Sequence, residues 1–439
     1  MGLGLLGRGV GDAVFLAQCG AHLTVTDLKT EKELAPSLKK LKRLKNIKFV
    51  LGRHRISDFQ KADLIIKSAG VPLDSPYIKE AKKHGVPVTM STALFAKLIP
   101  EDVTLIGVTG TRGKTTVTHL TYEILRSDKR RVFLGGNVRG VSTLALLKKV
   151  KPKDYVVLEL DSWQLQGFGD ERKSPHIAVF TNFLEDHMNY YRGNMNQYWK
   201  DKEYIFTHQK ERDIIFAGKG VVSRIRKNTR RKGELIVVDD IPKNWKLKMP
   251  GEHNRANAAF ATAVTHQIGV SRQIIKKTVE SFRGVPGRLE YLRTIRGVKI
   301  YNDTTATMPT ATIAALRALQ PTTYNPAKGE ARQRRLQLKI ILIIGGADKN
   351  LDMSTLLKEI PKYCKKVLLL PGTGTDKLSI KYKVSSIKYV KNLTMAVKEA
   401  LTHAERGDIV LFSPAFASFG LFKNEFDRGE QFNKLVDGL

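Results

Sequence analysis

The sequence predicts an α/β fold in three domains, and three observations lead to that prediction. At 439 residues the chain is too long for one compact core. Short apolar strand-like segments alternate with helix-like segments, and the alternation restarts near residues 99 and 286. Glycine-rich turns stand at residues 2–7 and 110–113, each directly before a helix-like segment. We therefore expect domains at residues 1–98, 99–285 and 286–439, each built on a parallel sheet.

The first domain is predicted to be Rossmann-like. In GLGLLGRGVGDAVFLAQCGAHLTVTDLK, the glycines Gly2, Gly4 and Gly7 precede a helix, and HLTVTD is a strand that ends at Asp27. An acidic residue about 20 positions after such glycines is typical of dinucleotide-binding folds. Such glycines normally follow a strand, yet only Met1 precedes them here. We therefore expect that an in-frame extension upstream of Met1 supplies the missing first strand. The segments KFVLG, DLIIKSAG and PVTMST complete the domain.

The central domain begins with the apolar segment VTLIGVTG, which runs into the turn GTRGKTT. Glycines there let backbone N–H groups approach an oxyanion, and the start of the following helix adds partial positive charge. Lys114 can then reach nucleotide phosphates, and Thr115 can bind Mg²⁺. Gly110 lies three residues before Gly113, which is shorter than the Walker spacing. We expect a P-loop-type ATP-binding domain whose parallel sheet includes VFLGG, YVVLEL and IAVFTNF.

Candidate metal ligands follow the next strands of this domain. Glu159 ends the strand YVVLEL, and Glu185, Asp186 and His187 follow IAVFTNF. Ligands of open α/β sheets bind at the carboxyl ends of the strands, and Mg²⁺ prefers oxygen ligands. Lys202 lies on the helical segment after these residues and, taken alone, is interpreted as a solvated lysine.

The C-terminal domain is predicted to be Rossmann-like from the strand-like segments GVKIYND, KIILIIGG, KVLLLPG and DIVLFSPAF. Residues 319–337, LQPTTYNPAKGEARQRRLQ, combine proline, glycine and charge without periodicity. That composition predicts an exposed loop inside this domain.

Composition narrows the classes of function. The formal net charge is +33, but the basic residues are scattered, and the densest runs (39–48, 224–232 and 328–335) contain no interleaved stacking aromatics. We therefore do not expect nucleic-acid binding as the main role. No apolar stretch reaches about 20 residues and no leader pattern is present, so we expect a cytoplasmic protein without a membrane span. Cys19 and Cys364 stand in ordinary core patterns, which excludes a disulfide framework.

The chain resembles the Mur ligases through eight motifs that cover nearly its whole length: GTRGKTT, LELDSWQLQ, TNFLEDHMNYYRGNMNQYWKDK, MPGEHNRANAAFA, GVPGRLE, YNDTTAT, GGADK and SPAFASFGLFKNEFDRGEQF. The resemblance implies ATP-dependent amide formation through an acyl phosphate, in peptidoglycan synthesis. The likeness is strongest to members that add D-glutamate to UDP-N-acetylmuramoyl-L-alanine, because of VTDLK and the last motif. We expect these two substrates as partners, and a monomer.

The resemblance also implies which residues contact the nucleotide. The expected ATP-binding residues are Gly110, Thr111, Gly113, Lys114, Thr115, Thr116, Asn257, Arg288 and Asp303. Among them Asn257 would contact adenine, Arg288 a phosphate and Asp303 the ribose.

Two Mg²⁺ ions are implied by the resemblance. Thr115 and Glu159 would hold the first ion between the β- and γ-phosphates. His187 would hold the second together with Lys202, provided that this lysine is carbamylated, since a carbamate turns a cation into an oxygen ligand. Lys114, His187 and Lys202 are thus the expected catalytic residues, and His187 would also help to accept the proton of the amine.

The substrates are expected on the first and third domains. The uridine end would contact Gly4, Gly7, Asp27, Ser68 and Gly70, so that the N-terminal glycines bind UDP and no nicotinamide is needed. Asn137 would lie near substrate and phosphate, and D-glutamate would contact Lys349, Ser418 and Phe419.

Some positions depart from the family pattern and keep alternatives open. Thr305 stands where the family commonly has lysine, and Asp161 replaces a common serine, which puts a carboxylate close to an anionic substrate. A related Mur-type amide ligase with another amino acid, such as L-glutamate, or with another acceptor therefore remains an alternative. An alternative of another class is a dinucleotide-binding oxidoreductase or nucleotide-binding regulatory module, which leaves GTRGKTT, Glu159 and His187 without a purpose.

Overall fold

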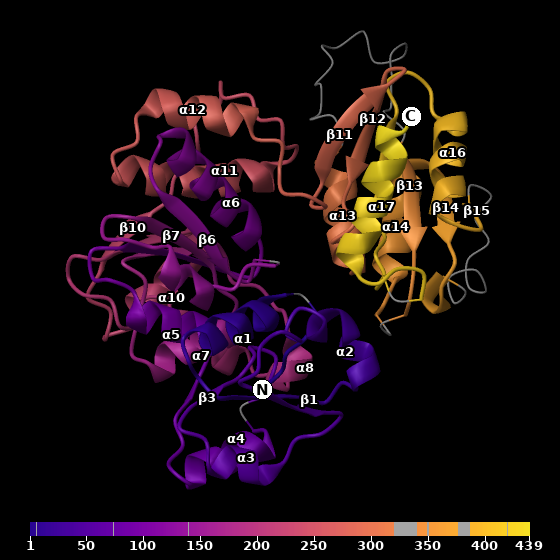
Figure 1. Ribbon diagram of the computed structural model, residues 1–439. Helices are drawn as coiled ribbons and strands as arrows, with labels where there is room; N and C mark the ends of the chain where they lie inside the picture. Colours follow the sequence, from indigo (N-terminus) through magenta and orange to yellow (C-terminus); the bar gives the residue numbers. More distant parts are fainter. Residues whose placement is uncertain are drawn as a thin grey trace. The chain divides into compact units, whose positions relative to one another are not determined.

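The computed structural model describes residues 1–5, 7–72, 74–138, 140–319, 340–348, 351–375, 387–418 and 420–439. The chain divides into two compact units (Figure 1). The first unit comprises Met1–Trp245 and Arg255–Val279, and the second comprises Lys246–Asn254 and Glu280–Leu439. Most residues of the first two predicted domains therefore share one compact unit, and the boundary expected at residue 98 stays a prediction.

A six-stranded parallel sheet forms the centre of the first unit, with the strand order β10-β9-β8-β5-β7-β6. Its strands are β5 (Thr104–Thr109), β6 (Val132–Gly136), β7 (Tyr155–Glu159), β8 (Ile177–Phe180), β9 (Ile214–Ala217) and β10 (Glu234–Val237). The helical segments of this part are α6 (Lys114–Ser127), η1 (Leu144–Lys148), α7 (Ser162–Asp170), α8 (Met188–Tyr191), α9 (Met195–Glu203), η2 (Lys219–Val221), α10 (Val222–Arg226), α11 (Glu252–Gln267) and α12 (Arg272–Ser281). The predicted parallel sheet is confirmed.

The carboxyl ends of three central strands meet at one edge of this sheet. The register pairs Val108 of β5 with Glu159 of β7, and Thr109 of β5 with Phe180 of β8. These strands read as continuous apolar runs because both of their faces are buried: neighbouring residues Leu105 and Ile106 are 2% and 0% exposed. The turn after β5, Glu159 and the segment after β8 consequently lie along the same edge.

Two short parallel sheets form the N-terminal part of this unit, β1 with β2 and β3 with β4. The elements are α1 (Arg8–Gln18), β1 (Leu23–Asp27), α2 (Glu31–Leu38), β2 (Ile47–Leu51), α3 (Ile56–Gln60), β3 (Ile65–Ile66), α4 (Pro76–Lys83), β4 (Val88–Thr89) and α5 (Ser91–Leu98). The Met1 amino group donates to the Ile66 carbonyl at 3.0 Å, and the Gly2 N–H donates to the Thr26 carbonyl at 2.8 Å. The backbone of residues 1 and 2 thus links β3 to β1.

The second unit is built on a six-stranded sheet with the order β11-β12-β16-β13-β14-β15. Its elements are β11 (Glu290–Ile295), β12 (Val298–Asn302), α13 (Pro309–Ala318), β13 (Ile340–Gly345), α14 (Ser354–Tyr363), β14 (Cys364–Leu370), β15 (Ile387–Tyr389), α16 (Leu393–His403), β16 (Ile409–Phe412) and α17 (Glu425–Asp437). Leu342 and Ile344 of β13 pack in a core with α13 and α14, whereas Ile341 and Ile343 pack in a core with α16 and α17 (Figure 1). Side chains alternate along a strand, so helices cover both faces of the sheet.

Some expectations differ from the structure. The edge strand β11 is antiparallel to β12, because a two-residue connection can only return the chain beside itself. Cys19 is exposed at the end of α1 rather than in the core, and Cys364 is partly exposed. The loop expected at 319–337 lies, after its first residue, outside the described residues. In the described part of the chain, every helix is too short or too polar to cross a bilayer.

Candidate nucleotide and metal site

The turn between β5 and α6 depends on two glycines. Gly110 has φ 139° and Gly113 has φ 86°, conformations that L side chains rarely adopt. A Cβ atom on Gly110 would lie 2.0 Å from Thr181 Oγ1, and one on Gly113 would lie 2.3 Å from Asn257 Oδ1. The structure therefore brings Asn257, which is 7% exposed, against the predicted phosphate turn. A side chain at either glycine would displace these neighbours.

The turn is also tied to the segment that follows β8. The Thr111 N–H donates to the Asn182 carbonyl at 2.9 Å, and the Arg112 N–H donates to Asn182 Oδ1 at 2.9 Å. The Thr111 hydroxyl donates to the Leu184 carbonyl at 3.0 Å. Asn182 thus positions two residues of the turn, a role that the sequence analysis missed although this asparagine stands in the motif TNFLEDH, because its partners lie about 70 residues earlier in the chain.

Lys114, the first residue of α6, folds its side chain back over the turn. Its Nζ donates to the carbonyl oxygens of Gly110, at 3.0 Å, and Thr111, at 3.1 Å. Thr115 and Thr116 follow in the first turn of the helix and are half-buried. The predicted ammonium and hydroxyl groups therefore lie beside the helix N-terminus, where an anion is favoured.

Glu159 and Asn137 meet at the neighbouring strand ends. Glu159 is 3% exposed, and its carbonyl accepts the Asn137 N–H at 2.7 Å. The Asn137 amide donates to Glu159 Oε1 at 3.5 Å, while Arg8 donates to Asn137 Oδ1 at 2.5 Å. Arg8 was not predicted as a site residue, and it connects the N-terminal helix α1 to this edge.

His187 directly precedes helix α8, as its N-cap, and has a left-handed backbone, φ 56°. Its ring packs on Trp163 at a centroid distance of 4.7 Å, and Nε2 lies 3.8 Å from Asp186 Oδ2. Burial lowers the pKa of His187, although the Asp186 carboxylate opposes that shift. A neutral imidazole is the form that binds a metal ion.

Lys202 is buried, so its interpretation as a solvated helix residue is wrong. The side chain of this residue is among the largest that are fully buried, at 1% exposure. Its Nζ donates to the Gly110 carbonyl at 2.9 Å and to Thr109 Oγ1 at 3.4 Å. Lys114 and Lys202 thus share the Gly110 carbonyl oxygen as acceptor. Burial holds the pKa of Lys202 well below its usual range, and the nearby Lys114 charge adds to the effect.

The donor set is suited to a hard divalent cation. Among the described residues, no group of three or more His, Cys, Asp or Glu side chains is placed to hold a metal ion. The two predicted sets of Mg²⁺ ligands do not require three such side chains in one place. Thr115 and Glu159 would add a hydroxyl and a carboxylate to phosphate oxygens, and Lys202 would become an oxygen ligand beside His187 only as a carbamate.

The N-terminal glycines, which are expected to contact the uridine end of the substrate, lie beside Asp27. The Gly4 N–H donates to Asp27 Oδ2 at 3.0 Å, and the Lys29 N–H donates to Asp27 Oδ1 at 2.9 Å. Gly7 has φ 84° and directly precedes α1. The structure therefore brings Gly4 and Asp27 together.

The loop after β3 contains the other two residues expected at uridine, Ser68 and Gly70, and both are exposed. Lys67 precedes them and was not predicted. It is 3% exposed, and its Nζ donates to the Val71 carbonyl at 3.1 Å, which closes the loop on itself. Burial lowers the pKa of Lys67 to about 8.

In the second unit, Asp303 lies at the end of β12 and is 8% exposed. The Leu289 N–H donates to Oδ1 at 3.0 Å, and the Ser413 hydroxyl donates to Oδ2 at 2.7 Å. Burial raises the pKa of Asp303 to about 7. Arg288, next to Leu289 in the chain, is exposed, so its guanidinium is available to an anion.

Asp303→Asn is expected to make stability less dependent on pH between about 4 and about 7. The pKa is about 7 in the folded protein and 3.8 in its ordinary state, so the unfolded chain loses this proton first as pH rises. The wild-type free energy of unfolding therefore falls through that window, whereas asparagine cannot ionise. Urea midpoints of both proteins across the window measure the difference. Parallel curves would contradict the prediction, and Asp437→Asn, an exposed position, is the control.

Arg428 is a buried residue of the second unit that the sequence analysis missed. It is 0% exposed, and its guanidinium donates to the Thr304 carbonyl at 2.7 Å, to Thr304 Oγ1 at 3.1 Å and to the Phe416 carbonyl at 3.2 Å. Burial lowers the pKa of Arg428 to about 10. This arginine therefore joins the segment after β12 to the segment after β16.

Only part of the predicted amino-acid pocket is described. Ser418 is 3% exposed, two residues after Phe416. The Thr305 hydroxyl donates to the Gly287 carbonyl at 2.9 Å, so the residue in the place of the family's lysine serves a backbone contact. Lys349 and Phe419 lie outside the described residues.

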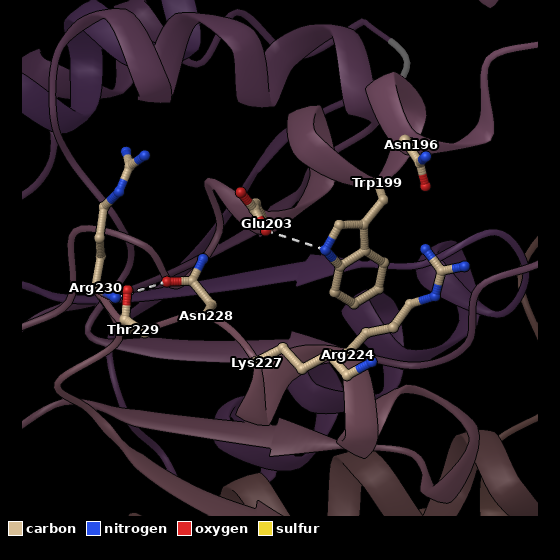
Figure 2. Close-up of a pocket in the computed structure, with 8 residues that line it drawn as sticks. All are labelled: Asn196, Trp199, Glu203, Arg224, Lys227, Asn228, Thr229 and Arg230. Atoms are coloured by element: carbon tan, nitrogen blue, oxygen red, sulfur yellow. Dashed lines mark hydrogen bonds between the residues drawn. The ribbon is translucent and has the colours of Figure 1, made fainter.

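A hollow of about 520 Å³ opens beside α9, and no predicted site residue lines it (Figure 2). Its lining residues are Asn196, Trp199, Glu203, Arg224, Lys227, Asn228, Thr229 and Arg230. The Trp199 indole donates to Glu203 at 3.0 Å, and the Arg224 guanidinium lies 5.4 Å from the Trp199 ring centre. The three cationic side chains are exposed, so the hollow is interpreted as a solvated part of the basic run 224–232.

Three family models match the chain, and together they span most of it. They are described as Mur ligase MurD-like, N-terminal domain (residues 1–90), Mur ligase middle domain (108–239) and Mur ligase, glutamate ligase domain (287–416).

Curated relatives match over the full length. The UDP-N-acetylmuramoylalanine--D-glutamate ligase of Borreliella afzelii (strain PKo) is 37% identical over 462 residues, covering 100% of this chain and 97% of the relative. The protein of the same name from Roseiflexus sp. (strain RS-1) is 36% identical over 477 residues, covering 100% and 98%.

Solved structures share the fold at lower identity. The UDP-N-acetylmuramate-alanine ligase MurC of Thermotoga maritima has a TM-score of 0.59 at 19% identity and covers 100% of this chain and 98% of its own. The MurF ligase of Thermotoga maritima in complex with ADP has a TM-score of 0.58 at 20% identity, covering 87% and 99%.

Proposed function

This chain belongs to the Mur ligase family, and on that basis we propose that it joins D-glutamate to UDP-N-acetylmuramoyl-L-alanine with hydrolysis of ATP. It is an ATP-dependent amide ligase of peptidoglycan synthesis. The substrates follow from the full-length relatives, whose names state this acceptor and this amino acid. The observation that supports the reaction type is the convergence of the phosphate turn, Glu159 and Lys202 at one edge of one parallel sheet.

The reaction needs an activated acid, because a carboxylate and an amine do not condense in water unaided. The acceptor carboxylate would attack the γ-phosphate of ATP to give an acyl phosphate, and the amine of D-glutamate would then displace phosphate. Lys114 would neutralise charge on the transferring phosphoryl group, assisted by the N–H groups of the turn. Water must be kept away from the acyl phosphate, which it would otherwise hydrolyse.

Mg²⁺, when bound, supplies positive charge to the phosphates. Thr115 and Glu159 would hold one ion. His187 and a carbamate on Lys202 would hold the other. Carbamylation requires an amine without its extra proton, and the burial that lowers the pKa of Lys202 favours that form. The carbamate would also remove one of the two cations that now share the Gly110 carbonyl.

The remaining roles are proposed by residue type and family likeness. Asn257 packs on the turn and would contact adenine. Asp303 would accept a ribose hydroxyl, Arg288 would bind a phosphate, and Ser418 would bind D-glutamate. The uridine end would lie on Gly4, Gly7, Asp27, Ser68 and Gly70.

Phosphate release from ATP is expected only when Mg²⁺, UDP-N-acetylmuramoyl-L-alanine and D-glutamate are all present. A coupled phosphate assay that omits each component in turn measures this dependence. L-glutamate and other amino acids, offered in the same assay, test the alternative donors. Phosphate release that does not depend on the acceptor or on the amino acid would contradict the proposed function.

A further inference from the structure

Asp161, which stands where Mur ligases commonly have serine, begins helix α7. Its Oδ1 accepts the Gln164 N–H at 2.8 Å, and Gln164 Oε1 accepts the Asp161 N–H at 3.1 Å. These reciprocal bonds fix the orientation of the carboxylate. Serine and asparagine cap helices about as well as aspartate, so capping alone does not account for a negative charge here. In the described part of the chain, Oδ2 accepts no hydrogen bond.

On both sides of Asp161 in the chain, a neighbouring residue is connected to one of the two groups expected to hold the second ion. On one side, the Leu160 carbonyl accepts the Thr109 hydroxyl at 2.7 Å, and Lys202 Nζ donates to that same hydroxyl oxygen at 3.4 Å. On the other side, Trp163, in the first turn of α7, packs on the His187 ring at 4.7 Å. Asp161 therefore stands in the chain between two residues, Leu160 and Trp163, whose contacts lead to Lys202 and His187.

We propose that Asp161 is an additional carboxylate of the divalent-metal site of His187 and carbamylated Lys202, with Oδ2 facing the ion or a water bound to it. This inference rests on the proposed function. A neutral imidazole and one carbamate together carry a single negative charge, which does not neutralise a divalent cation. Mg²⁺ also favours oxygen ligands and retains bound water. The carboxylate would strengthen metal binding, and without metal it would repel the acceptor carboxylate.

Mn²⁺ binding to the full-length protein tests the proposal. The wild type, Asp161→Asn and Asp161→Ser would be titrated with Mn²⁺ in bicarbonate buffer with ADP, with free Mn²⁺ followed by electron paramagnetic resonance. Both substitutions keep an N-cap and remove only the charge. We expect the second-site dissociation constant to rise about tenfold or more in both variants, the size of effect that partners of metal ligands show. Binding of the first ion should not change.

The control is Asp170→Asn, at the other end of α7, which should leave both dissociation constants unchanged. Unchanged Mn²⁺ binding in the Asp161 variants would overturn the proposal. A change confined to the KM for the acceptor, measured at saturating Mg²⁺, would also overturn the proposal. In that case Asp161 and Lys67 would act on the substrate and not on the metal ion. In either case, phosphate release that still requires both substrates would leave the proposed function standing. A wild-type protein that binds no second Mn²⁺ ion would also overturn the proposal. Phosphate release that no longer requires both substrates would contradict the proposed function itself.

Discussion

Lys114→Ala is expected to reduce ligase turnover by about a thousandfold or more, since a preorganised charge at a transferring phosphoryl group contributes that much. The Lys114 ammonium already lies on the turn, bound to the carbonyls of Gly110 and Thr111. A phosphate placed at the helix start would replace these acceptors with a stronger, charged one. Phosphate release at saturating ATP and both substrates measures the effect.

The control for this variant is Lys219→Ala, because that side chain is 75% exposed and its ion pair, at 3.5 Å, is with the exposed Asp239. It should retain wild-type turnover. Thermal unfolding of both variants separates lost chemistry from lost structure. Full activity in Lys114→Ala would remove the assignment of the turn as the phosphate site.

Lys202→Met is expected to reduce turnover by about a hundredfold or more, since it would remove one of the proposed metal ligands from the catalytic centre. Methionine fills a similar volume in a site that is 1% exposed, so the fold should be retained. If the wild-type lysine acts as a carbamate, its activity should also rise with bicarbonate and fall after carbon dioxide is stripped from the buffer. Labelled bicarbonate allows the carbamate carbon to be followed by NMR.

Lys200→Met is the matched control, because Lys200 lies on the same helix and is exposed. That variant should keep wild-type activity and the same response to bicarbonate. Carbamylation would be contradicted if wild-type activity did not change with bicarbonate and no NMR signal of a carbamate carbon were seen. A fully active Lys202→Met would exclude any catalytic role for this residue.

The sequence by itself determined the parts of this protein that depend on local chemistry. The apolar runs predicted four strands of each large sheet, β5 to β8 in the first and β12, β13, β14 and β16 in the second, because a strand buried on both faces must be apolar throughout. The shorter or more polar strands β9, β10, β11 and β15 were not predicted. The turn GTRGKTT predicted a phosphate site, since glycine conformations and a helix start are properties of adjacent residues. Lys114 and Thr115 were identified for the same reason, and the order of the eight motifs indicated the family.

Only the tertiary structure decided the burial and the charge environment of the site. Lys202 looks solvated in its helix, yet packing against the turn buries it and lowers its pKa. Asn182 and Arg428 stand inside two of the eight motifs but were given no role, because each acts by bonding to a segment distant in sequence. Asp161 is distinctive only because the fold connects its chain neighbours Leu160 and Trp163 to Lys202 and His187. Desolvation and pairwise electrostatics depend on which distant segments pack together, and spacing along the chain does not contain that information.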